Sequence, residues 1–278
     1  MRRWLLSVFL ALLPAAGLAQ DAAQTEEDKG FLTRFLEDNL SGSGRTVRID
    51  GFAGALSSRA TFTRLTIADD EGVWITIRDG AISWNRGALL SGMVGVNELS
   101  AAEIDLPRAP GSQADGTPSA AAGTFSLPEL PVSVNIGKIS AGRVNLGAAL
   151  LGTAAAVTLD GSMRLAGGEG AAKLAIRRID GPLGDLQLTA DYANSSRKLT
   201  LDLLAREGAA GIAASILGIP GQPAMQLAIN GSAPIDAFKA DVALSSDGQP
   251  RLAGQVTLST GTEGAQTFAA DLAGDIAP

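Results

Sequence analysis

Apolar and polar residues alternate along most of the chain from residue 45 onward. A period of two places successive side chains on opposite faces of an extended segment, so it predicts β-strands with one apolar and one polar face each. We call the clearest members of the apolar faces the apolar-face set. It comprises Leu65, Ile67, Ile75, Ile77, Val157, Leu159, Leu165, Leu186, Leu188, Leu199, Leu201, Leu227, Ile229, Val242, Leu244, Val256 and Leu258.

Short polar segments rich in Gly, Asp, Asn and Ser separate the alternating runs. Examples are residues 69–72, 160–161, 180–182, 194–196 and 246–248. Such segments favour tight turns between neighbouring antiparallel strands. The sequence therefore predicts a mainly β fold in which most strands follow one another as a meander.

Two segments have helical spacing instead. A short amphipathic helix near the start of the mature chain is predicted by Phe31, Leu32, Phe35, Leu36 and Leu40. The Ala-rich residues 208–217, which end before Gly218, predict a second short helix. Residues 108–127 are rich in Pro, Gly, Ser and Ala without periodicity, which is typical of a flexible connector.

The first residues are typical of a secretory signal. Arg2 and Arg3 precede an apolar run over residues 4–18 that ends in small residues. This run is shorter than the roughly 20 residues that span a bilayer, so we expect cleavage after Ala19 rather than retention as a membrane anchor. The predicted divisions are a signal peptide or signal anchor (1–19), a linker and amphipathic helix (20–44), a first β segment (45–107), the connector (108–127) and a continuing β groove (128–278).

Composition narrows the possible chemistry. The chain has no histidine and no cysteine, so Ser-His-Asp triads, Cys-His pairs and the common zinc sites lack their parts. A net charge of −7 gives no sign of a surface for nucleic acid. The adjacent carboxylates of residues 69–71 lack the alternating ligand spacing of a calcium loop and are interpreted as an exposed turn. We expect no enzyme activity, no catalytic or metal-binding residue and no cofactor; an envelope enzyme that uses carboxylates alone ranks last.

The predicted apolar strand faces allow two arrangements. They can form the ordinary core of a barrel or sandwich, which is the commoner use of such faces, or line the inside of an open, curved sheet. Aromatic residues make up only 4% of the chain, so few bulky side chains are present to fill a core. This composition favours a hollow, apolar interior.

Several short motifs follow one another in a specific order within residues 49–108. They are Ile49-Asp50-Gly51, Leu65-Thr66-Ile67, Asp70-Glu71-Gly72-Val73-Trp74, Ser83-Trp84 and Leu89-Leu90-Ser91-Gly92. In this order they resemble the beginning of the translocation and assembly module (TamB) family of AsmA-like, bridge-like lipid transfer proteins. Residues 127–147 and 208–223 are similar to that family too, so the likeness covers most of the mature chain.

The resemblance implies a protein in the periplasm of a Gram-negative bacterium, held in the inner membrane if its N-terminus is uncleaved. Its long, curved, antiparallel-rich sheet would form an open, taco-like apolar groove, with the apolar-face set in contact with phospholipid acyl chains. The implied function is phospholipid transport between the inner and outer membranes, or assembly of outer-membrane proteins, including autotransporters, with a TamA-like barrel partner. Family members are much longer, so this chain would correspond to an N-terminal portion. The alternative is a secreted β-sheet binding or adhesion module with a packed core.

Overall fold

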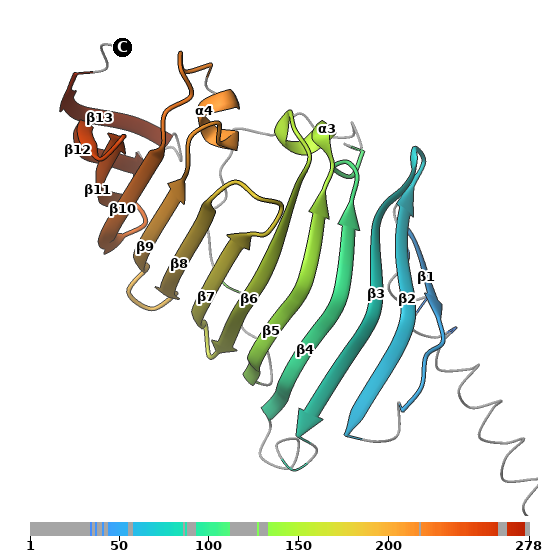
Figure 1. Cartoon of the computed structure of the whole chain (residues 1–278). Coiled ribbons are helices and arrows are strands. Elements are labelled where there is room, and N and C mark those ends of the chain that lie inside the picture. The colour runs from blue at the N-terminus through green and yellow to red at the C-terminus, as the bar shows by residue number, and fades with distance from the viewer. Residues whose placement is uncertain are drawn as a thin grey trace, which may run out of the picture.

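One large β-sheet contains most of the described chain (Figure 1). The computed structural model describes residues 44–54, 58–85, 93–111, 133–216, 218–260 and 266–275, together with the single residues 34, 37, 41, 87 and 127. The thirteen strands of the sheet are β1 (Thr46–Asp50), β2 (Arg59–Asp69), β3 (Gly72–Asn85), β4 (Met93–Leu106), β5 (Ser133–Leu146), β6 (Ala155–Ala166), β7 (Glu169–Arg178), β8 (Gly184–Ala193), β9 (Lys198–Glu207), β10 (Met225–Pro234), β11 (Ala237–Ser246), β12 (Gln249–Thr260) and β13 (Gln266–Gly274).

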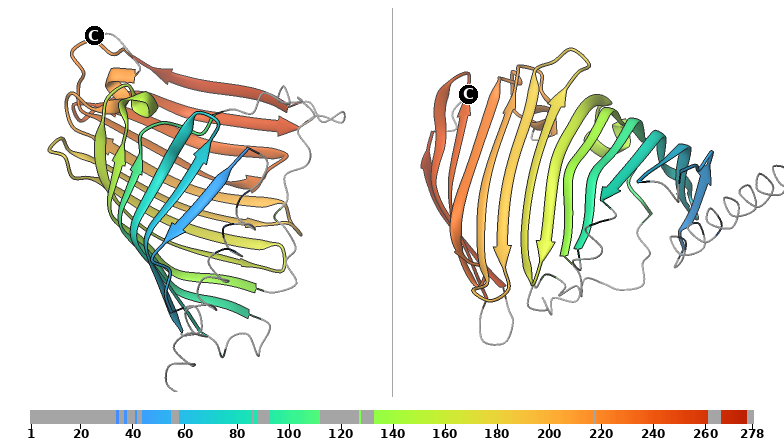
Figure 2. Two further views of the ribbon diagram at one scale, coloured as in Figure 1. Left: turned by 90° about the vertical axis from the view of Figure 1, so that its right-hand side faces the viewer. Right: turned by 90° about the horizontal axis from the view of Figure 1, so that it is seen from below.

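Among the elements that the structure describes, two short helices interrupt the meander. They are α3 (Ala148–Leu151), between β5 and β6, and α4 (Ile212–Ile216), between β9 and β10. Both lie at the same end of the strands, near each other (Figures 1 and 2). The second helix predicted from the sequence is therefore confirmed as α4. The first predicted helix lies outside the described residues except for Arg34 and Glu37, which are helical.

Spatial order in the sheet follows chain order from β1 to β13. Every neighbouring pair is antiparallel except β4 and β5, which run parallel. Two parallel strands need a crossover connection that leads the chain back to the end where the first strand began. Here this connection lies between Leu106 and Ser133. The two β segments predicted on either side of the connector are thus parts of one continuous sheet.

The sheet is curved and does not close (Figure 2). Within the described strands β1 and β13 stand at opposite edges and do not pair with each other. This arrangement confirms the predicted fold class, a mainly β chain that forms a long, curved, open and antiparallel-rich sheet.

A line of irregular positions crosses β2 to β5. Thr63, Asp79, Ala102 and Gly142 are left unpaired at one level of β2 to β5, and the register shifts there only against β6, between Ala141 and Val144. Asp79 has a positive φ of 48°. Each of these strands therefore has one more residue at this level than strict alternation allows. The apolar residues that precede and follow it lie on the same face of the sheet, whereas strict alternation would place them on opposite faces. A buried cluster of Ala141, Val144 and Val157 spans this line and shows the result.

The described residues do not form a conventional core. Their buried apolar residues are mostly Ala and Val, and no large side chain among them is fully buried. Since a closed barrel or a sandwich would enclose its inward Leu and Ile residues, this sheet is a single layer with one face still accessible.

One predicted turn is wrong. Asp160 and Gly161 lie inside β6 rather than between strands. A β-carbon on Gly161 would stand 2.7 Å from the carbonyl oxygen of Lys173, so the close approach of β7 explains this glycine. The other predicted turns do connect successive strands. None of the described helices is long and apolar enough to cross a bilayer.

Candidate functional site

One face of the sheet is apolar from β2 to β13. Residues paired across neighbouring strands share a face, so the register defines rows that run across the strands. The central row is Ala60, Ile82, Leu99, Ile139, Gly161, Leu174, Leu188, Leu203, Ile229, Val242, Gly254 and Leu272. It has one member in each of these strands and no polar side chain.

Two further rows flank the central row and are apolar in the same way. One is Phe62, Gly80, Ala101, Ala141, Leu159, Ile176, Leu186, Ala205, Leu227, Leu244, Leu252 and Gly274. The other is Trp84, Val96, Ile136, Met163, Ala172, Ala190, Leu201, Gly231, Ala240, Val256 and Ala270. We call these three the apolar rows.

The opposite face carries most of the polar side chains of the same strands, although one of its rows includes Leu204, Ala228, Ala243 and Ala253. One of its rows is Ser162, Lys173, Thr189, Asp202, Asn230, Asp241, Gln255 and Asp271. Nearer β1, Arg78 pairs with Glu103 and Asp105, and Asn145 donates hydrogen bonds of 2.7 Å to both carboxylates. The Asn145 amide, together with Arg78, lowers the pKa of Asp105. The sheet is therefore amphipathic.

All members of the apolar-face set lie on the apolar side of the sheet. Those within the apolar rows are Leu159, Leu186, Leu188, Leu201, Leu227, Ile229, Val242, Leu244 and Val256. Those beside the rows are Leu65, Ile67, Ile75, Ile77, Val157, Leu165, Leu199 and Leu258. Whether they contact lipid stays a prediction.

The sequence analysis missed several residues of the same face. They include Ile82, Leu99, Ile104, Ile139, Leu174 and Ile176. Those of β3 to β5 were missed because of the irregular positions. When alternation is counted from Ile77, it assigns the residues after Asp79 to the wrong face. Leu174 and Ile176 do alternate regularly within β7, so this signal was present in the sequence.

The apolar face ends in a cavity of about 390 Å³ beside the two helices. Leu151 of α3 and Ile212 and Ile216 of α4 form one side of it. Strand residues such as Leu186 and Leu227, which belong to the apolar rows, form the floor. The rows therefore continue into a partly covered pocket.

Glu207, at the end of β9, holds α4 over this pocket. Its carboxylate accepts hydrogen bonds from the backbone N–H of Ile212 at 2.5 Å and of Ala213 at 2.7 Å. A β-carbon on Gly211 would stand 2.4 Å from Oε2 of Glu207, so the glycine makes room for the carboxylate. An acidic group at the first N–H groups of a helix satisfies donors that have no partner within the helix.

Arg178 lines the pocket from the apolar side of the sheet, where it pairs with Val157. Its Nε donates to Oδ1 of Asp180 at 2.6 Å and its Nη2 donates to Oδ2 at 3.1 Å. This pair raises the pKa of Arg178 and lowers the pKa of Asp180. Only 9% of the Arg178 side chain is exposed.

At the other end of the strands, residue 127 is tied to the turn after β8. The side chain of Asn194 accepts a hydrogen bond from the N–H of Leu127 and donates one to its carbonyl, both at 2.8 Å. The Leu127 side chain lies over Gly170, where a β-carbon would stand 2.7 Å from it. Leu127 therefore covers a small part of the apolar face near the start of β7.

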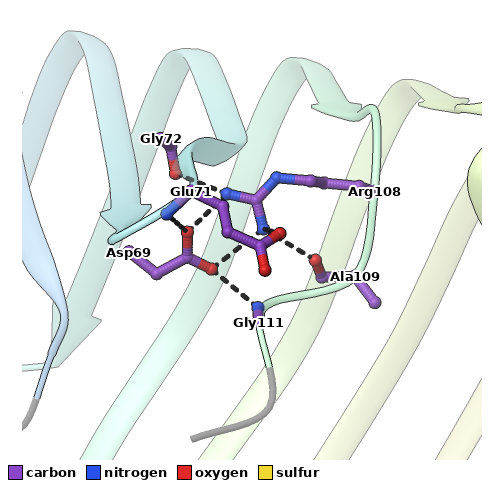
Figure 3. Close-up of polar contacts among 6 residues, drawn as sticks. All are labelled: Asp69, Glu71, Gly72, Arg108, Ala109 and Gly111. Atoms are coloured by element: carbon purple, nitrogen blue, oxygen red, sulfur yellow. Dashed lines mark hydrogen bonds and ion pairs between the residues drawn. The ribbon is translucent and has the colours of Figure 1, made fainter.

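The acidic turn before β3 holds an ion pair (Figure 3). Arg108 donates to the two oxygens of Asp69 at 2.5 and 2.9 Å and to the carbonyl of Gly72 at 2.7 Å. Asp69 also accepts the N–H of Gly111 at 2.7 Å. These contacts, the Arg108 hydrogen bonds first, hold the pKa of Asp69 well below its usual range. Asp69 therefore has a structural partner, although the sequence suggested an exposed turn.

Comparison with known proteins adds no family. No protein-family model, no curated protein and no solved structure matches this chain. Within the described residues, no group of three or more acidic side chains is arranged to hold a metal ion. What the chain can do is therefore inferred from the apolar rows and the pocket at their end.

Proposed function

We propose that this chain carries phospholipid by holding acyl chains along its apolar rows. The observation that supports the proposal is the continuity of the rows, which cross from β2 to β13 with only apolar side chains and glycine. At about 4.8 Å between strands the rows extend for roughly 50 Å. A bound chain could shift along this length without meeting a charged group.

The energetics of hydrocarbon transfer suit such a face. Each methylene group removed from water contributes about 0.8 kcal/mol, so a long acyl chain has a strong preference for the rows over water. Because the rows are apolar throughout and mostly aliphatic, the preference differs little from one position to the next. A surface of this kind binds hydrocarbon firmly overall while allowing movement along it.

Exposure of the rows favours this function over the alternative binding or adhesion module. Leu99 and Met163 are 37% and 41% exposed, although a module with an ordinary core would bury such residues. Large accessible apolar areas on a protein surface usually mark an interaction site. Transport between the inner and outer membranes, within the periplasm, is the setting that the sequence resemblance implies.

Support of outer-membrane protein assembly is the second candidate, and the two sheet edges differ in a way that bears on it. The outward N–H groups of Val47 and Ile49 in β1 already donate to Ser41 and Glu37. An unfinished strand that adds to the sheet would therefore pair with β13 rather than with β1. A TamA-like barrel protein is the partner expected for this role.

The test uses the full chain, purified in mild detergent, with a photo-crosslinker placed at single positions. Leu159, Leu188 and Leu201 probe the apolar rows. Their matched controls are the preceding residues on the polar face, Thr158, Gln187 and Thr200. We expect phospholipid to co-purify in native mass spectra and to crosslink from the first three positions, several times more strongly than from the controls.

A lipid-free protein without any face preference would contradict the proposal. Sedimentation of the same sample then decides what covers the face. A dimer would identify the rows as an interface between copies, and a lipid-free monomer would return the chain to the binding-module alternative.

A further inference from the structure

The pocket beside α3 and α4 contains a hydrogen-bond donor without an acceptor. Nη1 of Arg178 is buried and has no hydrogen-bond partner among the described residues. The other two guanidinium nitrogens donate to Asp180. Buried polar groups of proteins are nearly always paired, and an unpaired donor is unfavourable, so this nitrogen marks a place for an acceptor from a ligand.

Arg178 belongs to the lining of the pocket. It shares that lining with aliphatic side chains such as Leu151 and Leu186 and with polar side chains such as Asp185 and Glu207. Gly184 lies beside it, with the place of its missing β-carbon 3.2 Å from Cβ of Arg178. A molecule with a long apolar part and a polar group at one end matches this combination of aliphatic and polar lining.

Charge in the pocket decides which acceptor is favoured. Arg178 and Arg206 line it together with Asp185 and Glu207, and Asp180 is bound to Arg178. Carboxylates therefore exceed guanidinium groups by one. An anionic acceptor would be repelled by this excess, whereas a neutral carbonyl oxygen can accept from Nη1 without that cost.

We propose that Nη1 of Arg178 donates a hydrogen bond to the ester carbonyl oxygen of an acyl-glycerol lipid. The acyl chain attached to that carbonyl lies along the aliphatic lining and enters the apolar rows at Leu186 and Leu227. This inference rests on the proposed lipid-carrying function and adds to it a fixed position for the glycerol end. The pocket then fixes the position of the bound lipid along the sheet, whereas the rows alone would allow it to bind at many positions.

The test compares two lipids that differ only in the acceptor. Dipalmitoyl phosphatidylethanolamine and its dihexadecyl ether analogue are mixed in equal amounts with the full chain in detergent micelles, and bound lipid is counted by native mass spectrometry. A hydrogen bond to a charged group corresponds to roughly a tenfold preference for the ester form. Equal binding of the two lipids would overturn the inference while leaving the proposed function standing. Failure of both to bind would contradict the proposed function itself.

Variants locate the preference. The double variant Arg178→Met, Asp180→Asn removes the donor without leaving Asp180 unpaired. We expect it to bind both lipids equally while its total lipid load stays within about threefold of the wild type, because the aliphatic lining is intact. The control, Arg177→Met, changes the neighbouring arginine on the polar face and should keep the ester preference. A double variant that retains the preference would overturn the assignment to Arg178, and circular dichroism of both variants confirms that they fold.

A second comparison tests the charge of the acceptor. At pH 8, palmitate offers a carboxylate, whereas methyl palmitate offers a neutral ester on the same chain. The excess of carboxylates in the pocket predicts that the methyl ester competes better for the Arg178-dependent site. Stronger competition by palmitate, lost in the double variant, would show that the pocket takes a carboxylate and would overturn the ester assignment.

Discussion

The ring of Phe62 lies directly over Gly80 of the neighbouring strand. A β-carbon on Gly80 would stand 2.0 Å from Cζ of the ring, closer than any non-bonded contact allows. The pair sits within the apolar rows at the line of bulges, where the other members are small. An aromatic ring that covers a glycine on the next strand fills the space that the missing side chain leaves and excludes water from the backbone.

This pairing predicts that Gly80→Ala destabilises the protein. The added methyl group would displace the ring, and overpacking of this kind costs about 1–3 kcal/mol. Urea unfolding of the wild type, Gly80→Ala, Phe62→Ala and the double variant measures the effect as a cycle. We expect Gly80→Ala to cost much less in the Phe62→Ala background, because the ring is no longer there to be displaced. Equal costs in both backgrounds would mean that the backbone of β3, not Phe62, requires the glycine.

The fold followed from the sequence where strands are regular and did not where they are irregular. In β8 and β9 simple alternation placed Leu188 and Leu201 on the right face, because nothing in those strands shifts the count. In β3 and β4 the extra residues at Asp79 and Ala102 shift it by one, so Ile82 and Leu99 were missed. A bulge depends on what the neighbouring strands do at the same level, and a single strand's sequence does not contain that information.

Asp69 gives a prediction for acid stability. Its pKa is lowered in the folded state, chiefly by Arg108, so its contribution is complete above the unfolded pKa of about 3.9 and is lost as the pH falls below that value. Asp69→Asn should therefore lower the melting temperature by a few degrees at pH 7. The difference from the wild type should shrink steadily below about pH 4, because Asp69 is protonated first in the unfolded chain and only at lower pH in the folded protein.

Two variants serve as controls for the acid measurement. Arg108→Met removes the same ion pair from the other side and should show the same pH dependence. Asp70→Asn changes the exposed neighbour in the turn and controls for the loss of one negative charge there. A constant difference between wild type and Asp69→Asn from pH 7 to pH 2 would assign the role of Asp69 to its neutral hydrogen bonds instead of its charge.

The edge of β1 allows a test of how side chains protect an outer strand. Ser41 Oγ accepts from the N–H of Val47 at 2.8 Å, and Glu37 Oε1 accepts from the N–H of Ile49 at 2.7 Å. Each bond is worth about 1 kcal/mol, so Ser41→Ala should speed hydrogen exchange at Val47 by roughly three- to tenfold. Glu37→Ala should do the same at Ile49. The amide of Ile49 is the control for Ser41→Ala, and the amide of Val47 is the control for Glu37→Ala. Equal acceleration of both amides in either variant would indicate fraying of the whole edge.

Gly254 makes the pairing of the last two strands possible. It has a φ of 155°, and a β-carbon there would stand 2.1 Å from the carbonyl oxygen of Asp271 in β13. We expect Gly254→Ala to push β13 away locally and to destabilise it by about 1–3 kcal/mol, since neither backbone can yield cheaply. Hydrogen exchange should rise at Asp271 and Leu272 and stay unchanged in β2 and β3. Acceleration throughout the sheet would mean that β13 unfolds only together with the rest.

The pocket was the least predictable part of the candidate site. Ile176 and Arg178 are two residues apart in β7, so alternation does place Arg178 on the apolar side. The sequence could not show that Asp180 would accept hydrogen bonds from only two of the guanidinium nitrogens of Arg178. Nor could it show that Glu207 would hold α4 across the end of the sheet. Both contacts join residues close along the chain, two and five residues apart, but their geometry depends on how β7, β9 and α4 pack, which alternation does not record.

The parallel pairing of β4 with β5 has a consequence for the order of folding. Most other neighbours in the sheet are joined by short local connections, the longest of the rest being residues 208–224 between β9 and β10, and short hairpins form within microseconds. Joining β4 to β5 requires closure of the long segment between Leu106 and Ser133, which has a greater entropic cost. We therefore expect β1–β4 and β5–β13 to assemble as two separate cooperative units, with their junction formed last. Until that step each unit presents one long unpaired strand, and this interval is when the chain is most exposed to misassembly with another copy.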